Sequence, residues 1–174
     1  MVHDELLDVV DVHDHVVGQL PRSEVYRQRL LCRVVNVFLE NTRGQLWIPR
    51  RTAHKRHFPL CLDMSMGGHV ESGESYEKAL ARELSEELRI DVQTTTCELL
   101  GYLTPRQNGV SAFMKVYRIR TDDSPAYNKD DFSAAEWLLP EQLLRKIAEG
   151  EPAKGDLAAL TRYFYTEKTR GDPQ

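Results

Sequence analysis

Three glutamates of one short segment have the side-chain type and spacing that suit metal-ion chemistry. Glu83, Glu86 and Glu87 stand at relative positions i, i+3 and i+4, which are neighbours on one side of an α-helix. Carboxylate oxygens are the ligands that hard divalent cations prefer. If the three carboxylates converge in a cleft, each pair repels by roughly 3 kcal/mol at about 5 Å and an effective dielectric near 20. A bound cation would remove that repulsion.

The same glutamates are also compatible with an ordinary solvent-exposed helix face. There, like charges at this spacing repel by only a few tenths of a kcal/mol per pair, about what an exposed helix tolerates. The surrounding residues therefore have to decide between a metal site and a solvated face.

A helix must position these glutamates and bury its other side. Leu80, Leu84 and Leu88 recur at i, i+4 and i+8, which is the spacing of one apolar helix stripe. Ser75 precedes the stripe and is a suitable N-cap residue. We therefore expect a helix whose leucines face the core and whose glutamates lie on the other flank.

The segment 68–90, GHVESGESYEKALARELSEELRI, resembles the Nudix box. In words, the box is Gly, five residues, Glu, seven residues, Arg-Glu, an aliphatic residue, any residue, Glu-Glu, two residues and an aliphatic residue. Six fixed positions would match by chance in about one of 10⁷ windows, given ordinary residue frequencies. The residues in register are Gly68, Glu74, Arg82, Glu83, Leu84, Glu86, Glu87 and Ile90.

One position departs from this pattern, because Arg89 stands where the box usually has Gly. If the helix ends there in a left-handed conformation, Arg in place of Gly costs about 1 kcal/mol. The alternative is a helix that continues or ends differently.

The resemblance implies the Nudix fold, an α/β class fold in which a three-layer α/β/α sandwich surrounds a mixed β-sheet. It also implies a loop–helix–loop that binds Mg²⁺ or Mn²⁺ and hydrolyses a nucleoside diphosphate linked to another group. Glu83, Glu86 and Glu87 then look like the metal ligands, and the backbone carbonyl of Gly67 matches a further ligand in some members. Glu83 and Glu86 are our candidates for orienting or deprotonating the attacking water.

Other box positions look structural in this resemblance. Arg82 and Glu74 match an ion pair that holds the loop against the helix, and Gly68 opens the box. Many members recruit one more acid from a later loop, just before a short strand. Asp130 and Asp131 occupy such a place, and we choose Asp131 as the additional metal ligand.

A narrower similarity lies in residues 50–55 (RRTAHK) and 66–70 (MGGHV). Both are similar to the Nudix branch that includes isopentenyl-diphosphate isomerase and its hydrolase-like relatives. Arg50, Arg51 and Lys55 have the chemistry to hold diphosphate oxygens, Arg as a fork and Lys as a point charge. We expect these three residues to bind substrate.

The isomerase activity itself is disfavoured by two differences. The isomerase has a catalytic Cys where this chain has Gly67, and a metal-binding His where this chain has Cys32. Without the thiol, protonation and deprotonation of a carbon skeleton have no obvious agent, so we favour the hydrolase. His69 matches another metal-binding His of the isomerase, and in a hydrolase we expect it to be structural.

Several other residues keep two interpretations. The cluster 11–15 (DVHDH) has metal-compatible side chains but is expected in a strand or turn. Lys115 either extends along the surface or points into the substrate cleft. His54, Arg56 and His57 are expected at the surface, and a nucleotide base could stack on Tyr102, Phe113 or Tyr127.

The rest of the pattern predicts strands around one central helix and helices at the end. We expect a hairpin in the first 20 residues, a helical turn over 21–28, and strands near 33–40, 45–49, 97–103, 111–119 and 134–139. Pro140 suits the first position of a helix through Ile147, and Asp156 suits the cap of a last helix. No internal boundary is visible, so we expect one Nudix domain over 1–174, with an N-terminal strand or hairpin extension over 1–30 and the box at 68–90.

Composition restricts the class of protein. The 174 residues are 41% hydrophobic and 29% charged with a net charge of −4, which disfavours a nucleic-acid polymer as partner. No apolar run reaches the roughly 18–20 residues of a membrane span, and the acidic N-terminus does not resemble a signal peptide. The three cysteines lie far apart, which fits free thiols and the cytoplasm.

Together these features predict a Mg²⁺-dependent diphosphohydrolase, with Mn²⁺ as the other candidate ion, acting as a monomer or homodimer. The predicted substrates are nucleoside di- or triphosphates, which would yield the nucleoside monophosphate plus phosphate or diphosphate. Nucleotide sugars and isoprenyl diphosphates remain alternative substrates. A non-catalytic nucleotide-binding regulator is the alternative from another class.

Overall fold

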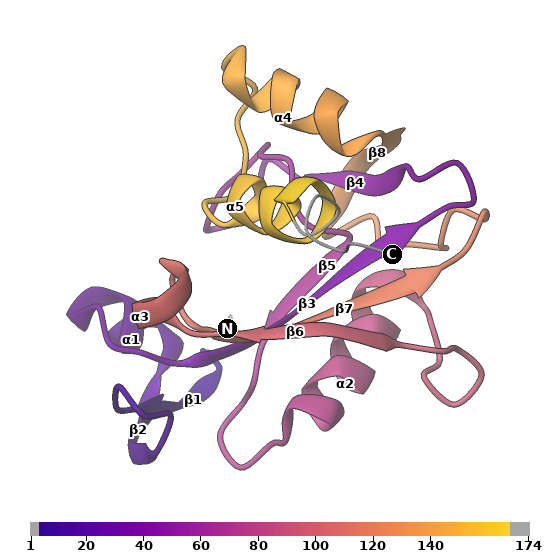
Figure 1. The fold of residues 1–174 in the computed structure, drawn as a ribbon. Helices are drawn as coiled ribbons and strands as arrows, with labels where there is room; N and C mark the ends of the chain where they lie inside the picture. Colours follow the sequence, from indigo (N-terminus) through magenta and orange to yellow (C-terminus); the bar gives the residue numbers. More distant parts are fainter. Residues whose placement is uncertain (1–3, 168–174) are drawn as a thin grey trace, which may run out of the picture.

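A computed structural model describes residues 4–167 of the chain (Figure 1). The elements follow in the order β1 (Leu6–Val10), β2 (Val16–Pro21), α1 (Arg22–Gln28), β3 (Arg33–Glu40), β4 (Leu46–Arg51), β5 (Met66–His69), α2 (Tyr76–Leu88), β6 (Glu98–Leu103), α3 (Pro105–Asn108), β7 (Phe113–Arg120), β8 (Phe132–Leu138), α4 (Pro140–Ala148), α5 (Leu157–Arg162) and the π-helical turn η1 (Tyr163–Glu167).

The main sheet is mixed and has six strands. Its order is β6-β7-β3-β4-β8, with β5 also paired to β3. β3 and β7 run parallel, whereas the other neighbours are antiparallel. β5 pairs with β3 from Val34 to Val37, and β4 pairs with it at Glu40. One edge of β3 therefore pairs both with β5, which precedes α2 in the chain, and with β4, which pairs with β8 on its other edge.

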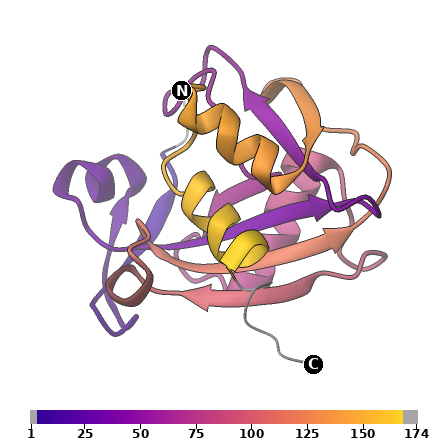
Figure 2. The same ribbon diagram turned by 45° about the horizontal axis from the view of Figure 1, so that its top comes forward.

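β3 is buried on both faces because its side chains alternate between two cores. Val35, Val37 and Leu39 pack with the leucines of α2. Phe38 points the other way and packs with α4 and α5, where Leu143 belongs to the same cluster. Figures 1 and 2 show α2 on one face of the sheet and α4 with α5 on the other. This is the predicted three-layer α/β/α arrangement.

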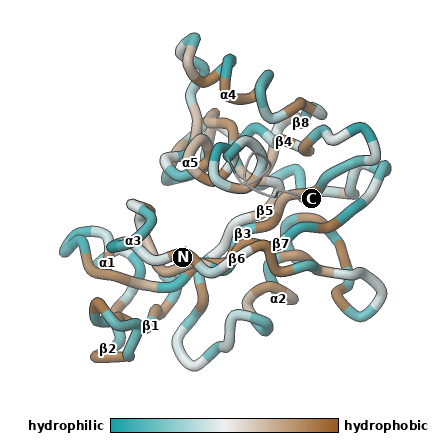
Figure 3. Tube along the Cα trace, viewed as in Figure 1, coloured by the Kyte–Doolittle hydropathy of each residue, from teal (hydrophilic) through white to brown (hydrophobic). Residues whose placement is uncertain are grey.

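Hydrophobic stretches follow most strands, α2 mixes hydrophobic and hydrophilic residues, and most connecting loops are hydrophilic (Figure 3). In the described residues 4–167 no helix has the length and apolar character needed to cross a membrane.

The N-terminal hairpin supports the glycine-rich loop that precedes α2. β1 and β2 pair antiparallel, and Leu7 forms a β-bridge with Glu71. The Asp8 carboxylate accepts hydrogen bonds from Ser72 Oγ at 2.8 Å and from Gly73 N at 3.3 Å. The first strand of the chain thus fixes the loop between β5 and α2.

The predicted elements are present with small shifts at their ends. The strand expected from 111 begins at Phe113, and the one expected from 97 begins at Glu98. Pro140 is the first residue of α4, as predicted. Asp156 precedes α5, but its side chain does not cap the helix. All three cysteines are free, in agreement with the sequence interpretation.

Candidate active site

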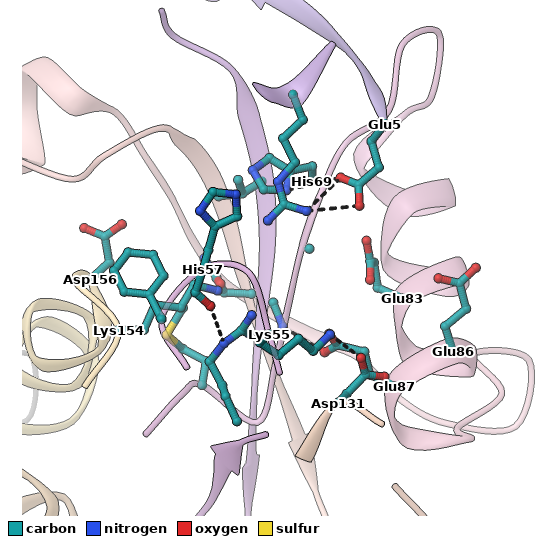
Figure 4. Close-up of a pocket in the computed structure, with 18 of the residues that line it drawn as sticks. Glu5, Lys55, His57, His69, Glu83, Glu86, Glu87, Asp131, Lys154 and Asp156 are labelled. Carbon is teal, nitrogen blue, oxygen red and sulfur yellow. Dashed lines mark hydrogen bonds and ion pairs between the residues drawn. The ribbon is translucent and has the colours of Figure 1, made fainter. Parts of the chain in front are cut away.

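A cavity of about 590 Å³ lies between α2, the β5 strand, α1 and the loops around residues 51–58 and 154–156. Figure 4 shows its two sides. Glu83, Glu86 and Glu87 come from α2 on one side, and His57, Lys154 and Asp156 lie on the other.

The helix α2 begins and ends as its local sequence dictates. Ser75 is the N-cap and accepts a hydrogen bond from Lys78 N at 3.2 Å. Arg89 ends the helix with φ 56° and ψ 31°, the left-handed conformation. The helix therefore ends where the Nudix pattern usually has Gly. Arg89 adopts the left-handed conformation there, which is less favourable for Arg than for Gly. Asn128 N donates to Glu87 O at 2.8 Å and so joins the last turn to a later loop.

The three box glutamates differ in exposure. Glu83 and Glu87 are buried on α2, at 8% and 9% exposed. The Glu86 side chain is 61% exposed. Glu87 Oε2 accepts a long hydrogen bond from Gly67 N at 3.4 Å. The fully solvated helix face therefore describes Glu86 alone.

Arg82 joins the box loop to the helix. Its Nε donates to Glu74 Oε1 at 3.0 Å, and its Nη2 donates to Glu74 Oε2 at 2.9 Å and to His69 O at 3.0 Å. Its Nη1 donates to Glu83 Oε1 at 2.8 Å. Arg82 thus forms the ion pair with Glu74 that the resemblance implied, and it also holds one box glutamate.

Both buried glutamates have raised pKa values. Burial raises the pKa of Glu83 to about 7, partly opposed by Arg82. Burial also raises the pKa of Glu87 well above its ordinary value, and the negative charges of Glu83, Asp63 and Asp131 add to the effect. The site therefore concentrates negative charge that no group in it fully compensates.

This donor set fits a divalent cation, although its members are not gathered around one point. Within residues 4–167, no three His, Cys, Asp or Glu side chains are arranged to hold a metal ion as they stand. Glu83 is turned toward Arg82, and the exposed Glu86 has room to turn. Oxygen ligands and crowded buried charge are the conditions that a hard cation relieves.

The predicted substrate-binding residues lie in different surroundings. Arg51 lines the cavity but is buried, and its Nη1 donates to Asp63 Oδ2 at 2.7 Å. Lys55 also lines the cavity and pairs with Asp131, the acid predicted as a metal ligand. Arg50 is not part of the cavity wall. Its guanidinium donates to Leu60 O and pairs with Glu151 at 2.8 Å.

Sequence reasoning missed Asp63 and Lys154, whose charges both act on Glu87. The Asp63 side chain is 2% exposed and 3.3 Å from Lys154 Nζ. Lys154 lowers the pKa of Glu87, so its positive charge faces the acidic side of the cavity. Lys154 lies in an irregular loop after Pro152, and no motif marks it. The bridge between Leu62 and Ala153 and the pair of Lys154 with Asp63 bring that loop to the site.

The aromatic residues suggested for base stacking do not line the cavity. Tyr102 stacks on Phe113 and donates to Asp14, and Tyr127 packs on Trp47. The cavity wall instead contains the aromatic side chains of Tyr26, His57 and Phe58. His57, which we expected at the surface, thus borders the cavity.

Other candidates have structural partners. His69 Nε2 lies 2.9 Å from Tyr26 Oη, and burial lowers its pKa well below the ordinary value. Asp14, from the 11–15 cluster, pairs with Arg33 at 2.6 Å. Lys115 pairs with Glu77 at 2.7 Å and does not reach the cavity.

The comparisons with known proteins agree with this geometry. The NUDIX domain family matches residues 30–160. The chain belongs to the Nudix family. A protein of Nostoc sp. that carries the name Nudix hydrolase is 59% identical over 162 residues, covering 92% of this chain and 96% of that protein. A crystal structure of DR0079 from Deinococcus radiodurans superposes with a TM-score of 0.88 at 49% identity, covering 92% of this chain and 99% of that one.

The similarity to the isomerase branch is also present at lower identity. Isopentenyl-diphosphate Delta-isomerase 2 of Photorhabdus laumondii is 28% identical over 137 residues, covering 78% of this Nudix chain and 77% of that protein. The Nudix family match and the relatives named as hydrolases support a Nudix-type hydrolase. The β1–β2 hairpin and α1 lie outside the matched range.

Proposed function

We propose that this Nudix protein is a Mg²⁺-dependent diphosphohydrolase, with Mn²⁺ as a possible substitute. Its substrates would be nucleoside di- or triphosphates, and its products the nucleoside monophosphate plus phosphate or diphosphate. The observation that carries this proposal is one cavity with buried Glu83 and Glu87 on one side and Lys154 on the other. A cation-bridged diphosphate would be complementary to both sides.

Glu83, Glu86 and Glu87 would hold the metal ion, with Asp131 and the Gly67 carbonyl as further candidates. When bound, such an ion withdraws charge from phosphate oxygens and lowers the pKa of a bound water. Glu83 and Glu86 are the proposed bases that orient the attacking water or accept its proton. Beside a bound cation these carboxylates would stay ionised and therefore able to accept a proton from water.

The cationic residues would act on the phosphate groups of the substrate. Water attacks one phosphorus, the bridging P–O bond breaks, and the bridging oxygen leaves with the second product. Lys154 and Lys55 line the cavity and can compensate the charge that develops on phosphate oxygens. Arg51 contributes by fixing Asp63 and the loop that carries Lys55.

A substrate panel tests the proposed activity. Phosphate and diphosphate release would be measured with nucleoside di- and triphosphates, nucleotide sugars and isopentenyl diphosphate, with Mg²⁺ or with a chelator. Metal-dependent turnover of nucleoside di- or triphosphates is the expected result. Preferred turnover of a nucleotide sugar or isopentenyl diphosphate would replace the proposed substrate, and nucleotide binding without turnover would favour a regulator.

Glu87→Gln tests the metal assignment separately. The amide keeps the shape of Glu87 and removes its charge, so turnover should fall by about 100-fold or more. The melting temperature in chelator should stay equal or rise, because a crowded buried charge is removed. Loss of the folded state in chelator would instead assign Glu87 a structural role.

A further inference from the structure

The cavity wall also contains aromatic side chains that the proposed phosphate chemistry does not use. Tyr26, His57 and Phe58 all line the cavity. Tyr26 is 43% and Phe58 45% exposed. Single exposed apolar residues are common on protein surfaces, but here two exposed aromatic residues and a histidine border the same cavity.

Phe58 has a backbone conformation that an aromatic residue rarely adopts. Its φ is 52°, and a bulky residue in this region is an outlier. The next residue is Pro59, which normally favours an extended conformation in the residue before it. Such strain persists only where surrounding contacts impose it, and it is concentrated at functional sites.

Two arginines impose this conformation from either side of Phe58. Arg51 Nε donates to His57 O at 3.2 Å, and Arg50 Nη1 donates to Leu60 O at 2.9 Å. Arg51 is itself fixed by Asp63. The arginines expected to bind phosphate thus hold the short loop that presents Phe58 to the cavity.

Tyr26 and His57 are also held in place. Their ring centroids lie 5.2 Å apart with an interplanar angle of 41°, and Tyr26 Oη lies 2.9 Å from His69 Nε2. Burial and the charge of Arg22 lower the pKa of His57, so its ring is neutral at neutral pH. The aromatic wall is therefore a fixed surface that combines residues of α1 and of the 57–58 loop.

We infer that this aromatic wall, with Phe58 as its main contact, binds the nucleobase of the substrate while the diphosphate lies toward α2. Base–aromatic stacking is worth about 1–3 kcal/mol per base and tolerates different bases. The cavity volume of about 590 Å³ lies in the usual range for a small-molecule site. The inference rests on the proposed function, since it assigns the base of that substrate.

Binding of non-hydrolysable probes tests the inference apart from turnover. Calorimetry with Mg²⁺ would give Kd for the α,β-methylene diphosphates of adenosine, guanosine, cytidine and uridine, and for methylenediphosphonate, which lacks the nucleoside. For each nucleoside analogue, the Kd of methylenediphosphonate divided by the Kd of the analogue measures the affinity that the nucleoside adds. Phe58→Ala should reduce this ratio by about tenfold for the best-bound nucleoside, within the range of base stacking.

The same loop provides a matched control. Leu60 is 51% exposed, has φ 61° and is not in the cavity wall, so Leu60→Ala should leave the ratio unchanged. Phe58→Trp should keep it, and Phe58→Leu should lower it, because leucine has bulk without a π-face.

Three results would overturn the inference. They are an unchanged ratio in Phe58→Ala, an equal loss in Leu60→Ala, and a wild-type protein that binds no nucleoside analogue more tightly than methylenediphosphonate. Failure of the proposed function is distinct, because it would appear as absent hydrolysis with the ratio still sensitive to Phe58. A melting curve of each variant confirms that it is folded.

Discussion

Gly68 and Glu83 are packed so closely that no side chain fits between them. A Cβ at Gly68 would lie 2.0 Å from Glu83 Cδ and 2.1 Å from its Oε1. Glu83 is buried and already held by Arg82. The absent side chain at Gly68 therefore defines where this carboxylate can be.

Gly68→Ala should displace the Glu83 carboxylate and impair turnover more than folding. A displacement of about 1 Å in a catalytic group costs on the order of 100-fold in rate. The contacting atoms belong to the end of a side chain, so the protein should remain folded. Gly18→Ala is the control, because nothing lies within 4 Å of a Cβ there. Equal activity of the two variants in a steady-state assay would contradict the assignment.

The raised pKa of Glu83 predicts a pH dependence of stability in the metal-free protein. The folded pKa is about 7, against an ordinary value of 4.5, so the folded state binds more protons than the unfolded state between these values. The free energy of unfolding should therefore fall as pH rises from 5 to 8, by at most about 3 kcal/mol from this group. Urea denaturation in chelator at several pH values measures it.

Glu83→Gln should flatten this pH dependence, since the amide does not titrate. Excess Mg²⁺ should also flatten it, because the ion favours the ionised carboxylate. Wild type and Glu83→Gln with parallel pH profiles in chelator would show that Glu83 ionises normally. Histidines of low pKa, such as His69, act in the opposite direction, so the comparison of the two proteins is the informative quantity.

The sequence predicted the box helix well because neighbouring residues determine both its packing against the core and the placement of its glutamates. Ser75 caps it, Leu84 and its neighbours bury one side, and Glu83 follows from the same 3.6-residue period. Most of the strands were predicted for a similar reason, since their apolar runs are continuous, but the glycine-rich β5 (Met66–His69) was not. The family resemblance then supplied the fold, which local patterns alone do not determine.

The other side of the cavity could not be predicted, because it depends on long-range packing. Tyr26 and Lys154 are separated by 128 positions in the sequence, yet both line the same cavity. The basic segment around Arg51 was recognised, but its partner Asp63 was not. The residue type shows that Arg51 is positively charged, but only the fold shows which acidic group it pairs with.

Arg51 and Arg50 should differ sharply in their effect on stability. Removing one partner of a buried ion pair costs about 3–5 kcal/mol because the other charge is left uncompensated. Arg51→Ala leaves Asp63 buried, with Lys154 at 3.3 Å as its remaining ion-pair partner among the described residues, so it should fall in that range. Arg50→Ala breaks a half-exposed pair with Glu151 and should cost about 0–1 kcal/mol.

Chemical denaturation of both variants gives the comparison. If Arg51→Ala unfolds at the wild-type denaturant concentration but loses substrate affinity, Arg51 binds substrate and does not support the loop. Arg51→Lys refines the test. Lysine keeps the positive charge, but it cannot reproduce the guanidinium geometry that donates to both Asp63 and His57 O.

Lys154 should contribute to turnover without contributing much to stability. Its ammonium lies across the cavity from the α2 glutamates and 3.3 Å from Asp63, and Arg51 still pairs with Asp63 when Lys154 is changed. Lys154→Gln should therefore reduce kcat/KM by about 100-fold, as for loss of one donor to a developing oxyanion. Lys115→Gln is matched in chemistry but removes a pair with Glu77 and a cation–π contact with Tyr76, both outside the cavity, so its kcat/KM should equal that of wild type. Steady-state rates of the two variants on the best substrate decide the matter: equal rates would remove Lys154 from the reaction, whereas a loss confined to Lys154→Gln would support its role in compensating charge on the phosphate oxygens.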